Sequence, residues 1–340
     1  MAIKESSNRL KILVTGGAGY IGSHTAKLLA CVGMEPVVLD NLSNGHRKAV
    51  RWGSFEEGDL ADRDFLQRVF EAHKFDGVIH FAAHAYVGES VSNPRKYFRN
   101  NVVNTLNLLD VMQDHGVNHL VFSSSCAVYG IPDSVPIGEG LSLKPVNPYG
   151  ESKLFVERIL RWYREAYGLC WIALRYFNAA GADPEGEAGE IHNPETHLIP
   201  LAIQAALGWI SELEIMGTDY PTSDGTAIRD YIHVCDLASA HVRALEHLFR
   251  GGTSLALNLG TGRGYSVREV IKTVEEISGR AVPHRAGARR PGDPPTLVAD
   301  PSKAAEVLQW TPRYPELGSI VETAWHWHAN QSLPEPHTNQ

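Results

Sequence analysis

The feature that most constrains the fold is a glycine-rich segment at residues 15–22, which reads TGGAGYIG. It directly follows the apolar run of residues 12–14, and the next apolar run, residues 37–39, ends at Asp40. Two short apolar runs joined by a glycine turn and a helical stretch are typical of a strand, helix and second parallel strand. We therefore expect a parallel sheet to begin here.

The glycines of this segment have the spacing of a dinucleotide-binding turn. Gly16 permits a tight turn, Gly19 lets the backbone approach a pyrophosphate, and Gly22 lets the helix lie close to the sheet. The amides at the start of that helix would face the phosphates. Asp40 would bind ribose hydroxyls and repel a 2′-phosphate, and residues 41–43 contain no arginine that would offset this charge. The sequence therefore favours NAD over NADP.

Length and charge restrict the class of protein. The chain has 340 residues, 43% of them hydrophobic, so two domains or one large and one small lobe are expected. The net charge of −8 argues against a general nucleic-acid surface. No apolar run reaches the ~18 residues of a membrane span, and residues 1–9 are too polar for a signal peptide. We expect a soluble, cytoplasmic protein, with its four scattered cysteines reduced.

Short apolar strands alternate with helical patterns in the first half, at residues 12–15, 37–40, 55–59, 78–82, 120–125 and 172–177. This alternation predicts an α/β fold with a doubly wound parallel Rossmann sheet, whose ligand lies at the carboxyl ends of the strands. Loop-rich composition after Asn178 predicts a smaller α/β substrate-binding lobe. We expect residues 1–180 to form the first domain and 181–340 mainly the second, with residues 230–260 returning to the first.

The segment at residues 147–153, NPYGESK, has the pattern of a helix start, with Asn147 as N-cap and Pro148 in the first turn. Tyr149 and Lys153 would then share one helical face. A nearby ammonium lowers the pKa of a phenol from its usual ~10, which would suit a base. Ser125 ends a predicted strand at the same edge of the sheet. The alternative is an exposed Tyr/Lys pair without a catalytic role.

Taken together, these motifs resemble those of the extended short-chain dehydrogenases/reductases, and within them the UDP-glucose (galactose) 4-epimerases. The matching stretches occur in the family's order over nearly the whole chain, at residues 15–22, 40–44, 57–59, 80–83, 87–90, 123–130, 149–153, 174–178, 217–233 and 290–293.

The resemblance implies a site. It makes Tyr149 the base, Lys153 the ligand of the cofactor ribose, and Ser125 the partner of the reacting hydroxyl. The NAD contacts that the glycine turn and the resemblance imply are Gly16, Gly19, Tyr20, Ile21, Gly22, Asp40, Asn41, Leu42, Ser43, Asn44, Gly45, Asp59, Leu60, Phe81, Ala82, Ala83, His84, Ala85, Asn100, Tyr149, Lys153 and Phe177. The implied nucleotide-sugar contacts are Ser125, Tyr149, Asn178, Leu198, Arg229, Arg290, Asp293 and Leu297.

The two residues directly after Ser125 restrict the type of reaction that is expected. Related enzymes that eliminate water or carbon dioxide have an acid there, whereas this chain has Cys126 and Ala127, so reversible C4 epimerisation of a UDP-sugar through a 4-keto intermediate is expected. The alternatives are a nucleotide-sugar dehydratase or decarboxylase, and a non-catalytic NAD-binding regulator.

The identity of the sugar is left open between hexose and pentose. The stretch at residues 81–88 is similar to epimerases of UDP-xylose and UDP-arabinose. Leu297 occupies the family's size gate and is expected to hinder an N-acetylated sugar. The resemblance also implies a homodimer through helices at 102–112 and 149–167. The histidine spacings at His80/His84 and His326/His328 do not suit a metal, and none is expected.

Overall fold

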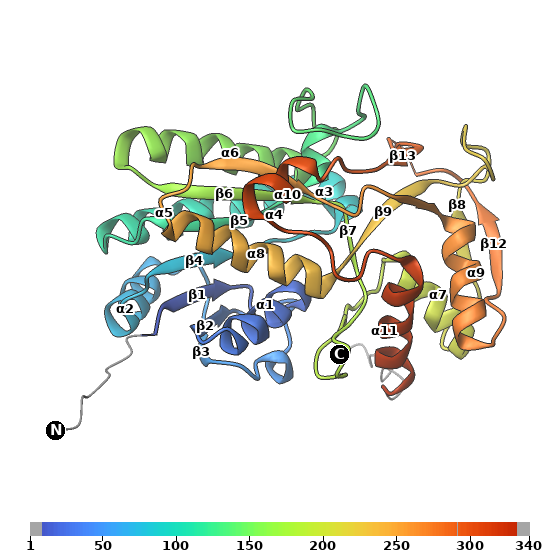
Figure 1. The fold of residues 1–340 in the computed structure, drawn as a ribbon, viewed down its shortest axis with the longest axis horizontal. Helices are drawn as coiled ribbons and strands as arrows, with labels where there is room; N and C mark the ends of the chain where they lie inside the picture. Colours follow the sequence, from blue (N-terminus) through green and yellow to red (C-terminus); the bar gives the residue numbers. More distant parts are fainter. Residues whose placement is uncertain (1–8, 291, 332–340) are drawn as a thin grey trace.

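Seven parallel strands form the main sheet, in the order β10-β6-β5-β4-β1-β2-β3 (Figure 1). The computed structural model describes residues 9–290 and 292–331. In chain order the strands are β1 (Lys11–Thr15), β2 (Glu35–Asp40), β3 (Ser54–Glu57), β4 (Gly77–His80), β5 (His119–Ser125), β6 (Cys170–Tyr176) and β10 (Leu255–Leu259). Their central residues are buried and apolar because helices cover both faces. The predicted doubly wound parallel sheet is confirmed.

Two layers of helices enclose this sheet. Apolar side chains of α2 (Arg63–His73), α5 (Asn104–Asp114) and α6 (Pro148–Tyr167) pack on one face, and those of α1 (Tyr20–Cys31) and α8 (Val234–Phe249) pack on the other. Each face therefore has its own buried core. Shorter elements connect these layers: η1 (Arg47–Ala49), α3 (Val87–Ser92), α4 (Pro94–Tyr97), the π-helix η2 (Phe98–Val103), η3 (Cys126–Tyr129) and α10 (Ser302–Leu308).

The direction in which the chain adds strands reverses at β1. From β1 it adds β2 and β3 on one side, and then β4, β5 and β6 on the other. At such a reversal the ligand of a parallel α/β sheet binds outside the carboxyl ends of the strands. Except for Asn100, which lies in η2, every predicted catalytic and cofactor residue of the first half lies at or just after the carboxyl end of a strand, or in the first two turns of a neighbouring helix.

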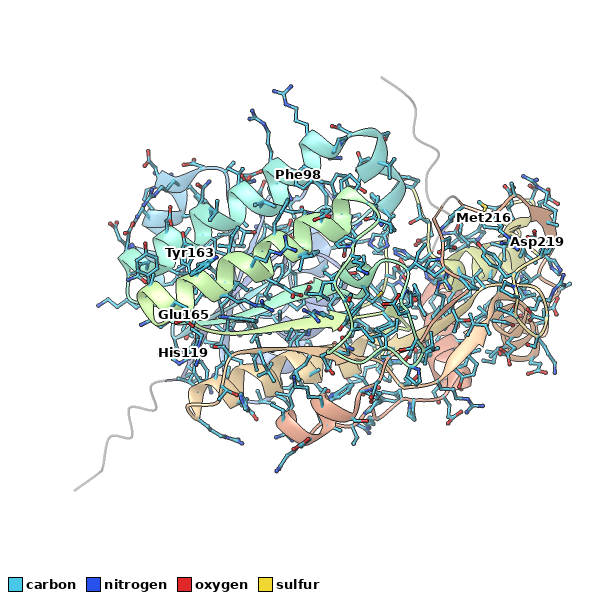
Figure 2. All side chains as sticks on the ribbon, turned by 90° about the horizontal axis from the view of Figure 1, so that it is seen from above. Phe98, His119, Tyr163, Glu165, Met216 and Asp219 are labelled. Carbon is cyan, nitrogen blue, oxygen red and sulfur yellow. The ribbon has the colours of Figure 1, made fainter. Side chains whose placement is uncertain are left out.

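A smaller lobe lies at one end of the molecule (Figure 1). Its apolar core joins α7 (Leu198–Leu207), α9 (Val267–Ser278) and α11 (Leu317–Ala329). Figure 2 places Met216 and Asp219 of this lobe far from His119, at the amino end of β5. The strands of the main sheet thus point their carboxyl ends toward the lobe. The lobe's own strands are β7 (Asn178–Ala180), β8 (Leu213–Met216), β9 (Ile228–His233), β11 (Gly264–Ser266), β12 (His284–Gly287) and β13 (Thr296–Leu297).

The segment expected to return to the main sheet, residues 230–260, is divided between the two parts. The helix α8 and the strand β10 pack in the first part, but β9 pairs with β7, β11 and β13, so the prediction was wrong for β9. Successive side chains of a strand point to opposite faces. Tyr231 accordingly packs in the lobe's core and Ile232 in the core of the main sheet.

Among the residues that the structure describes, none of the helices combines the length and the apolar composition that a membrane span requires.

Candidate active site

The glycine turn between β1 and α1 has no room for larger residues. Gly16 has a φ of +71°, and a Cβ there would lie 2.6 Å from the amide nitrogen of Ala82, which follows β4. A Cβ on Gly22 would collide with the carbonyl oxygen of Gly16. The turn therefore packs tightly against the carboxyl end of β4, as a phosphate-binding turn requires.

The start of α1 is open to an anion. Its N-cap, Gly19, has no side chain that could accept from the first amides of the helix. Such unsatisfied amides, together with the helix dipole, favour a phosphate group at this position. The residues of the turn thus fit the pyrophosphate of a dinucleotide.

Asp40 holds the loop after β2. Its carboxylate accepts hydrogen bonds from the amides of Ala18, at 3.0 Å, and Leu42, at 2.8 Å. Burial raises the pKa of Asp40, and these two hydrogen bonds oppose that rise. The side chain of Asn41 donates to Asp59 at 2.6 Å, so the predicted NAD contacts that follow β2 and β3 lie together.

The predicted segment at residues 81–85 lies beside the turn. The amides of Phe81 and Ala82 both donate to the carbonyl oxygen of Thr15, at 2.9 and 3.1 Å. These hydrogen bonds end β4 at His80, earlier than predicted, and hold the segment against β1. The backbone of His84 is fixed from the other side by the side chain of Asn101.

The predicted triad converges at the carboxyl end of β5. Asn147 caps α6 by accepting from the amide of Gly150 at 2.9 Å, which confirms the predicted helix start. The buried phenol of Tyr149 is hydrogen-bonded to the hydroxyl of Ser125. The ammonium of Lys153 donates to the carbonyl oxygen of Ser123 at 2.8 Å and lies 5.8 Å from the centre of the Tyr149 ring.

The electrostatics of this triad differ from the expectation. Burial raises the pKa of Tyr149 above its ordinary value, and the Ser125 hydrogen bond only partly opposes this rise. Burial also lowers the pKa of Lys153 to about 7. In the chain alone, burial therefore outweighs any lowering of the Tyr149 pKa by Lys153, and the effect of Lys153 stays a prediction. The physical reason is that phenolate and ammonium both lose hydration in a closed pocket.

The second lobe brings further predicted residues to the same end of the sheet. Arg229, on β9, binds the carboxylate of Asp293 at 2.5 Å, and the amide of Asp293 donates to the carbonyl oxygen of Arg290. Leu297 packs in one cluster with Phe177 and Cys126. Two more predicted residues stand at element starts: Asn178 begins β7 and Leu198 begins α7.

Two sets of residues that support the site were not predicted from the sequence. Asn101, next to the predicted Asn100, is buried and joins His84 to Ser152 of α6. The buried carboxylate of Glu157 binds Arg175 of β6 through two hydrogen bonds, and it accepts a third from Ser124. For Glu157 and Arg175, the only signal in the sequence was a charged residue inside an otherwise apolar pattern, and such a residue does not identify its partner.

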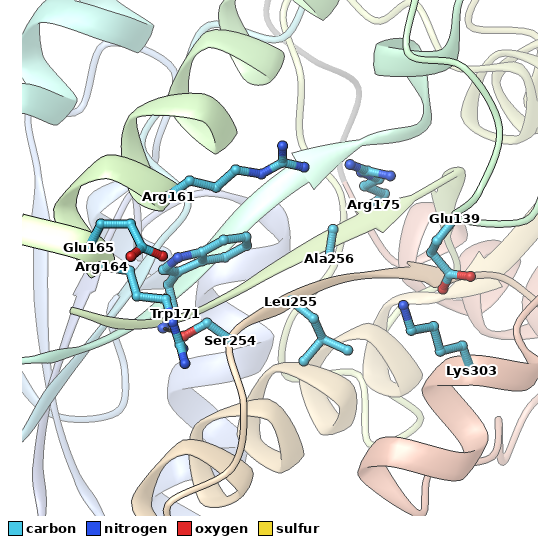
Figure 3. Close-up of a pocket in the computed structure, with 10 residues that line it drawn as sticks. All are labelled: Glu139, Arg161, Arg164, Glu165, Trp171, Arg175, Ser254, Leu255, Ala256 and Lys303. Carbon is cyan, nitrogen blue, oxygen red and sulfur yellow. Dashed lines mark hydrogen bonds between the residues drawn. The ribbon is translucent and has the colours of Figure 1, made fainter. Parts of the chain in front are cut away.

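A separate hollow of about 430 Å³ lies between α6 and α10, along β6 and β10 (Figure 3). None of the predicted site residues lines it. Figure 3 shows Arg161, Arg164 and Trp171 on its wall. The triad and the glycine turn lie outside it, so it is not the reaction site.

A family model described as the NAD dependent epimerase/dehydratase family matches residues 12–260. The chain belongs to this family. This membership confirms the resemblance drawn from the motifs, and it agrees with the placement of the triad beside the glycine turn.

Several relatives match this chain over nearly its full length. It is 54% identical to a UDP-glucose 4-epimerase of Rhizobium leguminosarum bv. trifolii, over 94% of this chain and 98% of that protein. The crystal structure of UDP-glucose 4-epimerase from Brucella ovis in complex with NAD matches with a TM-score of 0.92 and 56% identity, over 94% and 98% of the two chains. The enzyme of Stenotrophomonas maltophila, solved with NAD and formylated UDP-arabinopyranose, matches with a TM-score of 0.91 and 41% identity, also over 94% and 98%.

Proposed function

We propose that this member of the epimerase family is an isomerase that reversibly inverts C4 of a UDP-sugar, with NAD as a tightly held cofactor. The observation that carries the proposal is the buried cluster of Ser125, Tyr149 and Lys153, at the same carboxyl edge of the sheet as the glycine turn. Relatives of about 50% identity over 94% of the chain carry the name UDP-glucose 4-epimerase, which supports it.

The chain's own residues move the proton and hold the substrate. When bound, NAD supplies a two-electron oxidant for C4 and a positive charge that favours the phenolate of Tyr149. Tyr149 takes the proton of the C4 hydroxyl while Ser125 orients that hydroxyl, and Lys153 holds the ribose. The 4-keto sugar would turn about its bond to the diphosphate, so that the hydride given up by C4 returns to the opposite face of C4 and Tyr149 gives the proton back to the C4 oxygen.

The residues after Ser125 favour returning the hydride over elimination. Burial raises the pKa of the Cys126 thiol to about 12, so that thiol is neutral and a poor base near pH 7. Ala127 has no titratable group. A dehydratase or decarboxylase would need an added acid or base at this position.

The two lobes divide the ligand between them. We assign the NAD half to residues 9–180 with α8 and β10, and the UDP-sugar half mainly to the lobe that carries Arg229, Arg290 and Asp293. Arg229 and Arg290 bind the diphosphate, and for this Arg229 exchanges its Asp293 partner for phosphate oxygens. Tight binding far from C4 leaves the sugar free to turn.

A pentose is the second candidate substrate. The stretch at residues 81–88 is similar to that of pentose epimerases, and the matching Stenotrophomonas structure holds a UDP-arabinopyranose derivative. The decisive assay offers UDP-galactose, UDP-xylose and UDP-N-acetylglucosamine separately, and follows sugar stereochemistry by NMR and reduced cofactor by absorbance. Interconversion without accumulated NADH is expected. Net NADH formation, or loss of water or carbon dioxide, would contradict epimerisation.

A further inference from the structure

Four metal-ligating side chains meet in the loop between β7 and α7. The oxygen Oε1 of Glu190 lies 2.9 Å from Nδ1 of His192 and 2.8 Å from Nδ1 of His197. The two oxygens of Glu195 lie 2.9 Å from Nδ1 of His197 and 3.8 Å from Nδ1 of His192. One ligand atom from each of the four residues fits within 4.8 Å of all the others.

These spacings are close enough for one cation to reach all four residues. Zinc binds imidazole nitrogen and carboxylate oxygen at about 2.0–2.2 Å, which places ligand atoms about 3.3 Å apart at the corners of a tetrahedron. The nitrogen–oxygen distances within the cluster run from 2.8 to 3.8 Å, with one oxygen of Glu195 near His197 and the other near His192, so the side chains would shift slightly to bind an ion. Two nitrogens and two oxygens also form a ligand set that zinc accepts, whereas magnesium and calcium prefer oxygen alone.

Burial gives a second reason for a cation. The side chains of Glu190 and Glu195 are only 4% and 5% exposed, and no lysine or arginine of the described part of the chain pairs with either. The Nδ1 atom of His192 is fully buried and lacks a correctly directed hydrogen bond, although it points into the cluster. Two buried carboxylates cost free energy unless a positive charge compensates them, and here that charge comes either from the two histidines as imidazolium ions or from a bound cation.

The neighbouring acidic cluster provides a contrast. Asp183, Glu185 and Glu187 surround the ammonium of Lys27, whose nitrogen lies 2.6–2.9 Å from their oxygens. That cluster already contains its cation. In the cluster of Glu190, His192, Glu195 and His197, here called the loop cluster, no lysine or arginine of the described residues takes that place, and the two histidines alone face the carboxylates.

We propose that the loop cluster binds one divalent transition-metal cation of the zinc type, a site that the sequence analysis did not anticipate. Four protein ligands with no open position indicate a structural ion. The His192 ring contacts the edges or faces of Tyr20 and Tyr86, with ring centres 6.4 and 6.3 Å apart. His197 directly precedes α7. The ion therefore fastens the loop between the glycine turn and the start of α7.

The test measures metal binding and does not depend on the substrate. The purified full-length protein is stripped with a chelator, and Zn²⁺, Co²⁺ or Mg²⁺ is then added under calorimetry, with visible spectra for Co²⁺. We expect one equivalent of Zn²⁺ or Co²⁺ to bind, Co²⁺ to give the strong visible bands of a tetrahedral site, and Mg²⁺ not to bind. The thermal unfolding midpoint should rise with Zn²⁺.

Variants locate the site. His192→Ala and Glu195→Gln should each lower the affinity for Zn²⁺ by at least about tenfold. Glu185→Gln, in the neighbouring acidic cluster, and His326→Ala, on α11, are matched controls that should bind as the unchanged protein does. A stripped protein that takes up neither Zn²⁺ nor Co²⁺ would overturn the proposal whether or not the variants fold. Equal affinity in all four variants would overturn it too, because the ion would then bind elsewhere.

Discussion

At the scale of single residues, Tyr149 and Ser125 are the pair on which the chemistry depends. The phenol is buried, its pKa is raised by that burial, and its hydrogen bond to Ser125 opposes the rise. A buried phenol of this kind releases its proton only when positive charge compensates the phenolate. The pair therefore has a catalytic use only with an oxidised, positively charged cofactor bound.

Replacing the phenol with a ring of the same size separates catalysis from binding. Tyr149→Phe should lower kcat by roughly 10²–10⁴-fold because it removes the proton acceptor, while the NAD content of the purified protein stays unchanged. Epimerisation rates and bound NAD are measured on the same sample. If the variant were as active as the unchanged protein, a different base or a regulatory role would replace the proposed mechanism.

Leu297 tests the selection of the sugar. It packs in one cluster with Phe177 and Cys126, and the resemblance makes this the position at which a larger side chain hinders an N-acetyl group. Leu297→Cys should raise kcat/KM for UDP-N-acetylglucosamine by about tenfold, and change that for UDP-galactose much less. The two substrates serve as each other's control. Efficient turnover of the N-acetyl sugar by the unchanged protein would refute the hindrance.

At the scale of elements, a buried ion pair fixes α6 against the sheet. Glu157 of α6 and Arg175 of β6 are both nearly inaccessible, and the pair extends through Tyr129 to Asn258 on β10. Because α6 carries both Tyr149 and Lys153, this network determines how the catalytic helix sits on the strands.

Removing one charge of this pair leaves the other buried without a partner. Glu157→Gln should reduce the free energy of unfolding by about 3–5 kcal/mol, as measured by chemical denaturation. Glu165→Gln, on the exposed end of the same helix, is the control and should change it by less than about 0.5 kcal/mol. A loss in the Glu157 variant no larger than in the control would mean that the pair contributes nothing to stability.

At the scale of the whole molecule, large apolar side chains on one face are exposed to solvent. Trp162 of α6 is 74% exposed, and Phe155 of the same helix and Val103 beside α5 are 39% and 50% exposed. Exposed large apolar residues on adjoining helices are typical of a protein interface. We propose that two copies of the chain pair through α5 and α6, as the resemblance implies.

A charge placed on this face tests the dimer. The chain has a mass of 37.4 kDa, so analytical ultracentrifugation of the unchanged protein should give about twice that mass. Trp162→Glu should shift the mass toward a single chain, because a buried unpaired carboxylate weakens the interface. Val32→Glu, which alters an exposed apolar residue at the end of α1, should leave the dimer intact. A monomeric unchanged protein would exclude this assembly.

Local patterns determined much of this structure from the sequence alone. Apolar runs specified the parallel strands, steric limits at Gly16 and Gly22 specified the turn, and Asn147 specified where α6 begins, because each depends on residues close together in the chain.

Tertiary structure decided which distant groups meet and how much water they keep. It placed β9 in the second lobe, paired Arg229 with Asp293, and reversed the expected shift in the pKa of Tyr149. It also folded the 190–197 loop so that two histidines and two glutamates face one another. Charge energies depend on distance and burial in space, and neither can be read from spacing along a chain.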